Sequence, residues 1–270
     1  MSTTTAPTPP AAASRGVPFA ASTTTRVVTF LLLAYTVYAV AQLDFSWNRF
    51  VEGLGHGARL IGKMFPPDLG KWDILVKGMV ESMQIAVLAT VLGISISLPL
   101  GFLGARNLMP GWVTWIARAI VAICRSLHPV IVAILFVKAV GFGALAGILA
   151  LTVASIGFVG KLFAEAIEEI SPKQVEAVRA TGASFMNVIL FGVLPQVMAR
   201  FVGFVTYQLD SNLRNSTMVG IVGAGGIGGA LFSAFQRFDY GFVFTILATI
   251  VCIIVLAEIG TNYVKKAFHV

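Results

Sequence analysis

Long runs of apolar residues recur along this sequence, and they constrain the fold more than any other feature. Of the 270 residues, 57% are hydrophobic and only 11% are charged, whereas a typical soluble domain is about half apolar and about a quarter charged. So few charges cannot cover the surface of a soluble protein of this length, and the apolar excess must face lipid. At roughly 20 residues per spanning helix, the chain has room for about five or six spans and none for a soluble catalytic domain.

Six apolar segments are predicted to cross the membrane, which makes the chain an all-α integral membrane protein. They cover about residues 27–43, 82–103, 113–140, 143–163, 188–205 and 241–260. Residues 1–25 are mostly Ser, Thr, Ala and Pro and lack the apolar content to fold. We therefore predict a disordered tail at residues 1–25 and a membrane domain at residues 26–270.

Two segments near the N-terminus allow alternative interpretations. Ala39-Val40-Ala41 in the first apolar run resembles the cleavage site of a signal peptide. The polar stretch before that run is long for a signal peptide, so we favour a retained membrane helix. In residues 44–78, apolar and basic residues interleave as in an amphipathic segment at a membrane interface, and an ordinary connecting loop fits equally well.

Charge and composition argue against several other classes of protein. The net charge is +7, but the basic residues lie scattered between apolar runs, which favours cytoplasmic anchoring over nucleic-acid binding. Their distribution favours a cytoplasmic N-terminus, although five basic residues in segment 44–78 would then lie outside. Cys124 and Cys252 lie within apolar runs and are predicted to be small buried residues. The three histidines are too dispersed for a metal site, and nothing suggests a catalytic triad.

Two glycine motifs resemble nucleotide sites, but their context does not support that function. Residues 223–228 fit G-x-G-x-x-G, yet no βαβ unit surrounds them and no acid follows about 20 residues later. Residues 57–63 read G-x-x-x-x-G-K, but Met64 replaces the hydroxyl of a P-loop. We expect Gly223, Gly225 and Gly226 to form irregular backbone that gates a pathway or offers amides to an anion. Simple close packing of helices is an equally good alternative.

The charged segment of about residues 165–195 is predicted to form a helical hairpin. Pro172 suits the first turn of a helix, residues 174–180 are mostly good helix formers, and Gly182 supplies the left-handed position that ends a helix. A more apolar helix follows, and Pro195 bends its entry into the next span. Such a hairpin is a stiff handle that can transmit the movement of a partner to the membrane helices.

This hairpin resembles the EAA loop of bacterial ABC-importer permeases, E-A-A-x-x-x-G followed after nine residues by I-x-L-P. The positions that match in residue and spacing are Glu176, Ala177, Gly182, Leu194 and Pro195. Val178 replaces the second alanine, and Gly192 stands where isoleucine is usual. The resemblance implies that the loop docks into a groove of a separate ATP-hydrolysing subunit, with polar contacts from Glu176 and Arg179. An ordinary charged loop is the alternative.

The similarity extends to roughly residues 65–265 and is greatest to the phosphonate-transporter permease family. The segments that carry it are residues 125–129, 136–143, 160–170 and 212–228. Methionine permeases share the glycine-rich run and the loop, but segments 125–129 and 212–217 look more like the phosphonate group. The cargo implied is a phosphonate or a related phosphorus oxyanion, with phosphite, phosphate or an amino acid such as methionine as alternatives.

This family resemblance also implies a setting and a set of partners. It implies the type I-like architecture of importer permeases in the bacterial inner membrane, with both termini in the cytoplasm. The expected partners are a second permease copy in a homodimer, two ATP-binding subunits, a periplasmic or lipid-anchored substrate-binding protein and membrane lipid. The chain itself is expected to have no enzymatic activity and no cofactor, because ATP and Mg would bind the partner ATPase. A secondary transporter or channel that needs no ATPase is the rival class.

Ionisable residues within or beside the apolar runs are candidates for an anion pathway. They are Arg125, His128, Lys138, Asp210 and Arg214. Charged groups at membrane depth are costly and usually face a partner or a water-filled path, and arginine pairs well with phosphoryl oxygens. Three simpler roles stay open: an ion pair between Asp210 and Arg214 four residues apart, snorkelling of Arg125 to an interface, and a helix cap at His128.

Overall fold

The computed structural model describes residues 23–43 and 46–267, and the regular structure in these ranges is helical throughout. The chain forms two compact units that divide between Arg59 and Leu60. In the first unit, α1 (Thr23–Gln42) is long and apolar enough to span a membrane, and none of its residues is buried. This helix matches the predicted first span. The predicted disordered tail lies outside the described residues, apart from its last three positions, which begin α1.

Helix α2 (Trp47–Lys63) lies in segment 44–78, for which the sequence allowed either an amphipathic element or a connecting loop. Apolar side chains recur at Trp47, Phe50, Val51 and Leu54, the spacing that places them on one face of a helix. The segment is therefore a two-faced helix, and the loop alternative is wrong for these residues. Its expected position at a membrane interface stays a prediction.

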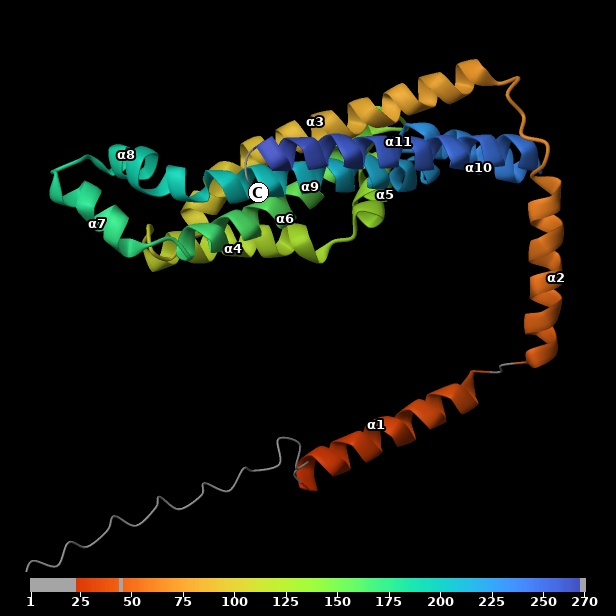
Figure 1. Ribbon diagram of the computed structural model, residues 1–270, viewed down its shortest axis with the longest axis horizontal. Coiled ribbons are helices and arrows are strands. Elements are labelled where there is room, and N and C mark those ends of the chain that lie inside the picture. The colour runs from red at the N-terminus through yellow and green to blue at the C-terminus, as the bar shows by residue number, and fades with distance from the viewer. Residues whose placement is uncertain (1–22, 44–45, 268–270) are drawn as a thin grey trace, which may run out of the picture. The chain divides into compact units, whose positions relative to one another are not determined.

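The second unit is a bundle of long helices arranged around α6 (Figure 1). Its main members are α3 (Trp72–Gly104), α4 (Gly111–Ser126), α5 (Pro129–Val140), α6 (Ala144–Glu168), α9 (Leu194–Ile221), α10 (Ile227–Gln236) and α11 (Tyr240–Ala267). Helix α6 contacts α3, α4, α5 and α9. Figure 1 shows α7 and α8, the arms of the predicted hairpin, projecting from one end of the bundle, with α10 at the other end.

The predicted span at residues 113–140 is broken into α4 and α5, which meet at an angle of 91°. The break lies at Leu127–His128, directly before Pro129. Proline disfavours helical backbone at the preceding residue, and His128 has the extended ψ of 135°. The described residues thus contain five helices long enough to span, or six if the bent pair counts as one span, in agreement with the predicted all-helical membrane fold.

The penultimate span runs further than predicted, and the helix after it was not predicted. Apolar character fades after residue 205, yet α9 continues to Ile221 through Gln208, Asp210 and Asn212. These polar residues ended the predicted segment at residue 205. Helix α10 is only ten residues long, which is too short to span a membrane, so its apolar run did not indicate a span.

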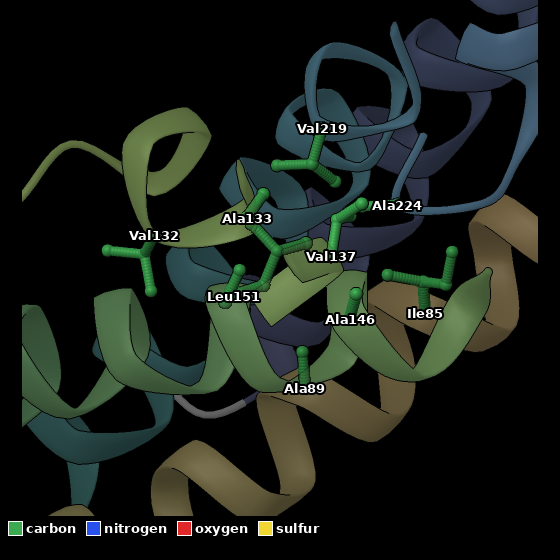
Figure 2. Close-up of a cluster of buried hydrophobic side chains, with 10 residues drawn as sticks. Ile85, Ala89, Val132, Ala133, Val137, Ala146, Leu151, Val219 and Ala224 are labelled. Atoms are coloured by element: carbon green, nitrogen blue, oxygen red, sulfur yellow. The ribbon is translucent and has the colours of Figure 1, made fainter. Parts of the chain in front are cut away.

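Small side chains let α3, α5, α6 and α9 approach closely in the core (Figure 2). Ala89, Ala133, Ala146 and Ala150 are completely buried there. At Gly147, an added Cβ would lie 2.4 Å from the carbonyl oxygen of Ala224. Only glycine fits at this position, because the loop between α9 and α10 approaches the backbone of α6 closely there.

Candidate functional site

The segment from Ile170 to Leu194 forms the predicted helical hairpin. Helix α7 (Pro172–Ala180) has proline in its first turn, and Gly182 follows with φ +78°, a value that glycine adopts readily. The returning arm begins with α8 (Phe185–Asn187) and a π-helical turn (Val188–Val193), and α9 starts at Leu194 with Pro195 in its first turn. The helix, the turn and the returning helix are confirmed, and the π-helical turn is a feature that the pattern did not indicate.

The two faces of this hairpin differ. Val175 is buried with Val188, Val193 and Val197 in a cluster that includes residues of α6. Glu176, Ala177 and Arg179 are exposed on α7, and no ion pair is recorded for Glu176 or Arg179 among the described part of the chain. The hairpin therefore packs its apolar side onto the bundle and presents charge on its outer side, as a docking surface requires.

Gly192, which departs from the usual isoleucine, lies where the two arms of the hairpin meet. An added Cβ would lie 3.6 Å from the Cα of Val175 and from a methyl group of Val178. These are ordinary contact distances. Val178 thus fills the space beside Gly192, and the two departures from the family pattern occur at positions that face each other.

The base of the hairpin is tied to the bundle by polar contacts that the sequence patterns did not reveal. On the α6 side, Glu168 accepts hydrogen bonds from the Arg118 guanidinium at 2.6 Å and from the Arg106 backbone N–H at 2.8 Å. On the α9 side, Arg200 donates to Glu169 at 2.5 Å, and the N–H of Ser171 donates to Gln196 at 3.1 Å. Arg118 and Glu168 are 50 residues apart in the chain, so no local pattern could have paired them.

A cavity of about 490 Å³ opens between α3, α4 and α6, with Arg125 in its wall. Arg118, Lys161 and Glu165 also line it. Lys161 pairs with Glu165 at 3.5 Å and Arg118 pairs with Glu168. No ion pair is recorded for Arg125 within the described residues. Of the predicted pathway residues, Arg125 is therefore the one that combines an available charge with a cavity.

Lys138 is exposed on α5, lies outside the lining of the Arg125 cavity and has no ion pair recorded among the described residues. The remaining ionisable candidates have local partners. Asp210 and Arg214 form the ion pair within α9 that was the simpler alternative. The Nδ1 atom of His128 accepts a hydrogen bond from the N–H of Val130 at 3.3 Å and so caps α5. One oxygen of Asp210, Oδ1, is buried without a recorded hydrogen bond. Asp210 lines a mainly apolar cavity of about 400 Å³ between α3, α9 and α11, separate from the one that Arg125 lines.

The glycine-rich run forms irregular backbone, as expected, and it also packs closely. Gly223, Gly225 and Gly226 have φ values of +89°, +80° and +79°. An added Cβ at Gly226 would lie 2.5 Å from the Ser82 hydroxyl, and that hydroxyl accepts from the N–H of Ile227 at 2.9 Å. The N–H groups of Gly223 and Ala224 donate to carbonyls at the end of α9. Of the three glycines expected to offer amides to an anion, Gly223 has its amide engaged within the protein. For Gly225 and Gly226 that role stays a prediction.

A buried polar network joins α3, α6 and α9 within the bundle. The Asn212 amide donates at 2.9 Å to both Thr90 and Ser155, and Gln208 donates to Ser155 at 3.0 Å and to Asn212 at 2.9 Å. Hydrogen bonds of this kind hold membrane helices in one relative position. The network lets α9 continue through polar residues. Its members are uncharged, so the pattern of ionisable residues did not indicate it.

At the end of the bundle away from the hairpin, Lys71 ties two loops together. Its ammonium group pairs with Asp239 and, at 3.3 Å, with Asp68. The hydrogen bond from the Lys71 ammonium to Asp239 raises the pKa of Lys71 above its ordinary value. The pKa of Asp68 is lowered, first by the Gly70 N–H that it accepts and then by Lys71. We call Asp68, Lys71 and Asp239 the loop clip.

Known transport permeases are similar to this chain over most of its length. Two relatives come from Stutzerimonas stutzeri. The phosphite transport system permease protein PtxC is 36% identical over 89% of this chain and 87% of its own length. The putative phosphite transport system permease protein HtxC is 37% identical over 85% of this chain and 81% of its own length. The phosphate-import permease protein PhnE of Mycolicibacterium smegmatis is 37% identical over 87% of this chain and 43% of its own length.

A solved structure and a family model agree with these relatives. The inward-facing MetNI methionine ABC transporter contains a chain that is 26% identical, with a TM-score of 0.65 over 74% of this chain and 99% of that one. Residues 97–269 match the model of the binding-protein-dependent transport system inner membrane component. The chain belongs to this family of membrane-embedded ABC-transporter permeases, as its hairpin and its helical bundle indicate.

Proposed function

We propose that this chain is the membrane-spanning subunit of an importer of phosphorus oxyanions, driven by ATP that a partner subunit hydrolyses. The observation that supports this cargo most directly is the gradient of similarity. Relatives named for phosphite or phosphate transport are 36–37% identical over 85–89% of this chain. Relatives named for D-methionine transport are 25–27% identical over 73%.

The hairpin is the proposed contact with the ATPase. Its exposed face carries Glu176 and Arg179, and its apolar face is anchored to α6 and α9 through the cluster around Val175. A rigid body that is exposed on one side and anchored on the other suits the transmission of force between subunits. Docking of this face places the hairpin and the C-terminus in the cytoplasm, and it places the loop clip outside.

Arg125 is the proposed contact with the anion. A guanidinium group binds phosphoryl oxygens through paired, charge-assisted hydrogen bonds. The cavity that holds Arg125 has space for a small oxyanion. The roles first considered for His128, Asp210 and Arg214 in the pathway receive less support, because those side chains are engaged within their own helices.

The test of this proposal is substrate-stimulated ATP hydrolysis in the assembled transporter. The chain is reconstituted in liposomes with its ATPase and its substrate-binding protein, and hydrolysis is measured with methylphosphonate, phosphite, phosphate and methionine in turn. We expect a phosphorus oxyanion to stimulate hydrolysis and to be taken up, whereas stimulation by methionine alone would contradict the proposed cargo. Uptake by the chain without its ATPase would identify a secondary transporter or channel.

A further inference from the structure

The hairpin has two roots in the bundle, and they differ in how they are held. Arg200 at the α9 root pairs with Glu169, the residue directly after α6, and this ion pair is exposed, with 53% and 66% of the side-chain surfaces accessible. At the α6 root, Arg118 and Glu168 are less accessible, at 34% and 26%. Exposed ion pairs contribute little because water and salt screen them. The α6 root therefore has the firmer electrostatic attachment.

Glu168 is held by more than one element. Its Oε1 atom accepts both from Arg118 of α4 and from the backbone of Arg106, in the turn after α3. In the same turn, the Asn107 amide donates at 2.7 Å to the carbonyl of Ile167. The last turn of α6 is thus fastened to the α3–α4 connection directly before the hairpin begins at Pro172.

Arg118 continues this attachment toward the cavity. Its Nε–H donates at 2.8 Å to the carbonyl of Gly104, the last residue of α3, while its terminal nitrogen reaches Glu168. Arg118 also lines the cavity that holds Arg125. The two arginines are seven residues apart on α4, about two helical turns, so they lie on one face of that helix. A displacement of the α6 root thereby reaches the helix that carries the proposed anion contact.

We infer that the pair of Arg118 and Glu168 transmits movement of the hairpin to α4 and to the wall of the anion cavity. Both are positioning residues: Glu168 follows the hairpin, and Arg118 transfers that displacement to α4. This inference rests on the proposed docking of the hairpin to an ATPase. It adds a specific route by which that docking changes the membrane helices.

The experiment compares variants of this pair in the assembled transporter, with ATPase and binding protein in liposomes and methylphosphonate or phosphite as the imported anion. Glu168→Gln keeps the size of the side chain and an oxygen for the Arg106 N–H, but it removes the charge that attracts Arg118. We expect the number of anions imported per ATP hydrolysed to fall about ten-fold, the order expected when a charge-assisted hydrogen bond is lost. Arg118→Gln is expected to have the same effect.

Matched controls separate transmission from general disturbance. Glu169→Gln and Arg200→Gln remove the exposed pair between the two roots, and we expect them to leave the ratio within about two-fold of wild type. Arg118→Lys keeps the charge but loses the fork of donors, so it is expected to give an intermediate ratio. Retention of the ATPase during purification is measured for every variant.

The outcomes distinguish this inference from the proposed function. If wild type imports the anion and both Gln variants of the pair keep the wild-type ratio, the inference is wrong while the proposed function stands. Loss of both ATPase retention and uptake in all three variants of the pair would make it a folding element and would also overturn the inference. If wild type itself shows no ATP-driven uptake, the proposed function fails, and the inference fails with it.

Discussion

At the scale of single residues, partners decide which charges are available for function. Arg125 and Arg214 are both exposed arginines on helices of the bundle. Arg214 is paired within α9, whereas Arg125 lines a cavity with no recorded ion pair among the described residues. An arginine that is already paired would have to give up that pair before it could bind an anion. The structure therefore favours Arg125 as the anion contact.

Arg125→Ala is expected to reduce anion uptake while leaving the ATPase bound. A charge-assisted hydrogen bond contributes about 1.5–3 kcal/mol, so uptake at low anion concentration should fall about ten-fold or more. The measurement is uptake of a phosphorus oxyanion into liposomes that contain the assembled transporter. Lys138→Ala is the control, because Lys138 is an exposed cation on α5 outside the residues that line the cavity. Wild-type uptake by the Arg125 variant would assign that residue to anchoring.

The loop clip gives an expectation for the pH dependence of stability. Asp68 has a pKa below its ordinary 3.8, so its stabilisation is present above that value and is lost as the pH falls through the folded-state pKa. Lys71 has a pKa above its ordinary 10.5, so its stabilisation is present below that value and is lost as the pH rises through the folded-state pKa.

Lys71→Met should therefore lower the melting temperature between these two pH values and lower it less outside them. The measurement is thermal unfolding of the detergent-purified chain across a pH series, expressed as wild type minus variant. Lys77→Met is the control, because Lys77 is exposed on α3 and has no ion pair recorded within the described residues. A difference that does not change with pH would show that the clip acts through packing alone.

At the scale of elements, the hairpin keeps its turn and its proline although two of its positions depart from the family pattern. Gly182 reverses the chain with a positive φ, and Pro195 starts the helix that leads into the membrane. The π-helical turn between them places Gly192 in contact with Val178. The arms thus remain closely packed although both residues depart from the family pattern, and the hairpin keeps the stiffness that its proposed role requires.

Glu176→Lys is expected to uncouple uptake from ATP hydrolysis without affecting membrane insertion. The side chain is exposed on α7 and has no ion pair recorded in the described part of the chain, so reversing its charge leaves the fold of the hairpin unchanged and alters only the docking surface. The measurement is retention of the ATPase together with anion uptake. Lys173→Glu, a charge reversal at another exposed position of α7, shows whether any change of charge has this effect. Unaltered uptake in Glu176→Lys would contradict the docking role.

At the scale of the whole molecule, the proposed mechanism needs two hairpins, since two ATP-binding subunits are expected. Many apolar side chains of the described bundle are exposed, among them Trp112, Trp115 and Ile123 on α4. In a membrane protein, lipid or another subunit can cover such surfaces. Stutzerimonas stutzeri has three relatives named for phosphite transport, PtxC, HtxC and HtxE. The second permease subunit is therefore either a copy of this chain or a different permease protein.

We expect the purified transporter to contain two copies of this chain. The measurement is its mass by light scattering, together with co-purification of a tagged and an untagged copy expressed in the same cell. Recovery of both forms through one tag supports the homodimer. Recovery of a single copy with a different permease protein would replace the homodimer by a pair of unlike subunits, while leaving the hairpin and its ATPase contact as proposed.

Features that depend on neighbouring residues could be predicted from the sequence, and features that depend on contacts between distant segments could not. The apolar runs indicated the spans because lipid excludes unpaired polar groups, and Pro172, Gly182 and Pro195 indicated the hairpin because each restricts its own backbone. Residues 127–129 contain a proline, but their pattern did not say that the chain would bend by 91°. That angle depends on the helices against which α4 and α5 pack.

The sequence by itself therefore determined the class of the protein, the apolar segments that form its long helices and the helical hairpin. These depend on hydrophobicity and backbone preference, which act within a few neighbouring residues. The tertiary structure alone decided that Arg125 lines a cavity with no ion pair recorded among the described residues, and that Arg214 is engaged within its helix. It also decided that Arg118 holds Glu168 across 50 residues. Such assignments require side chains from distant segments to meet, and only the packing of the helices brings them together.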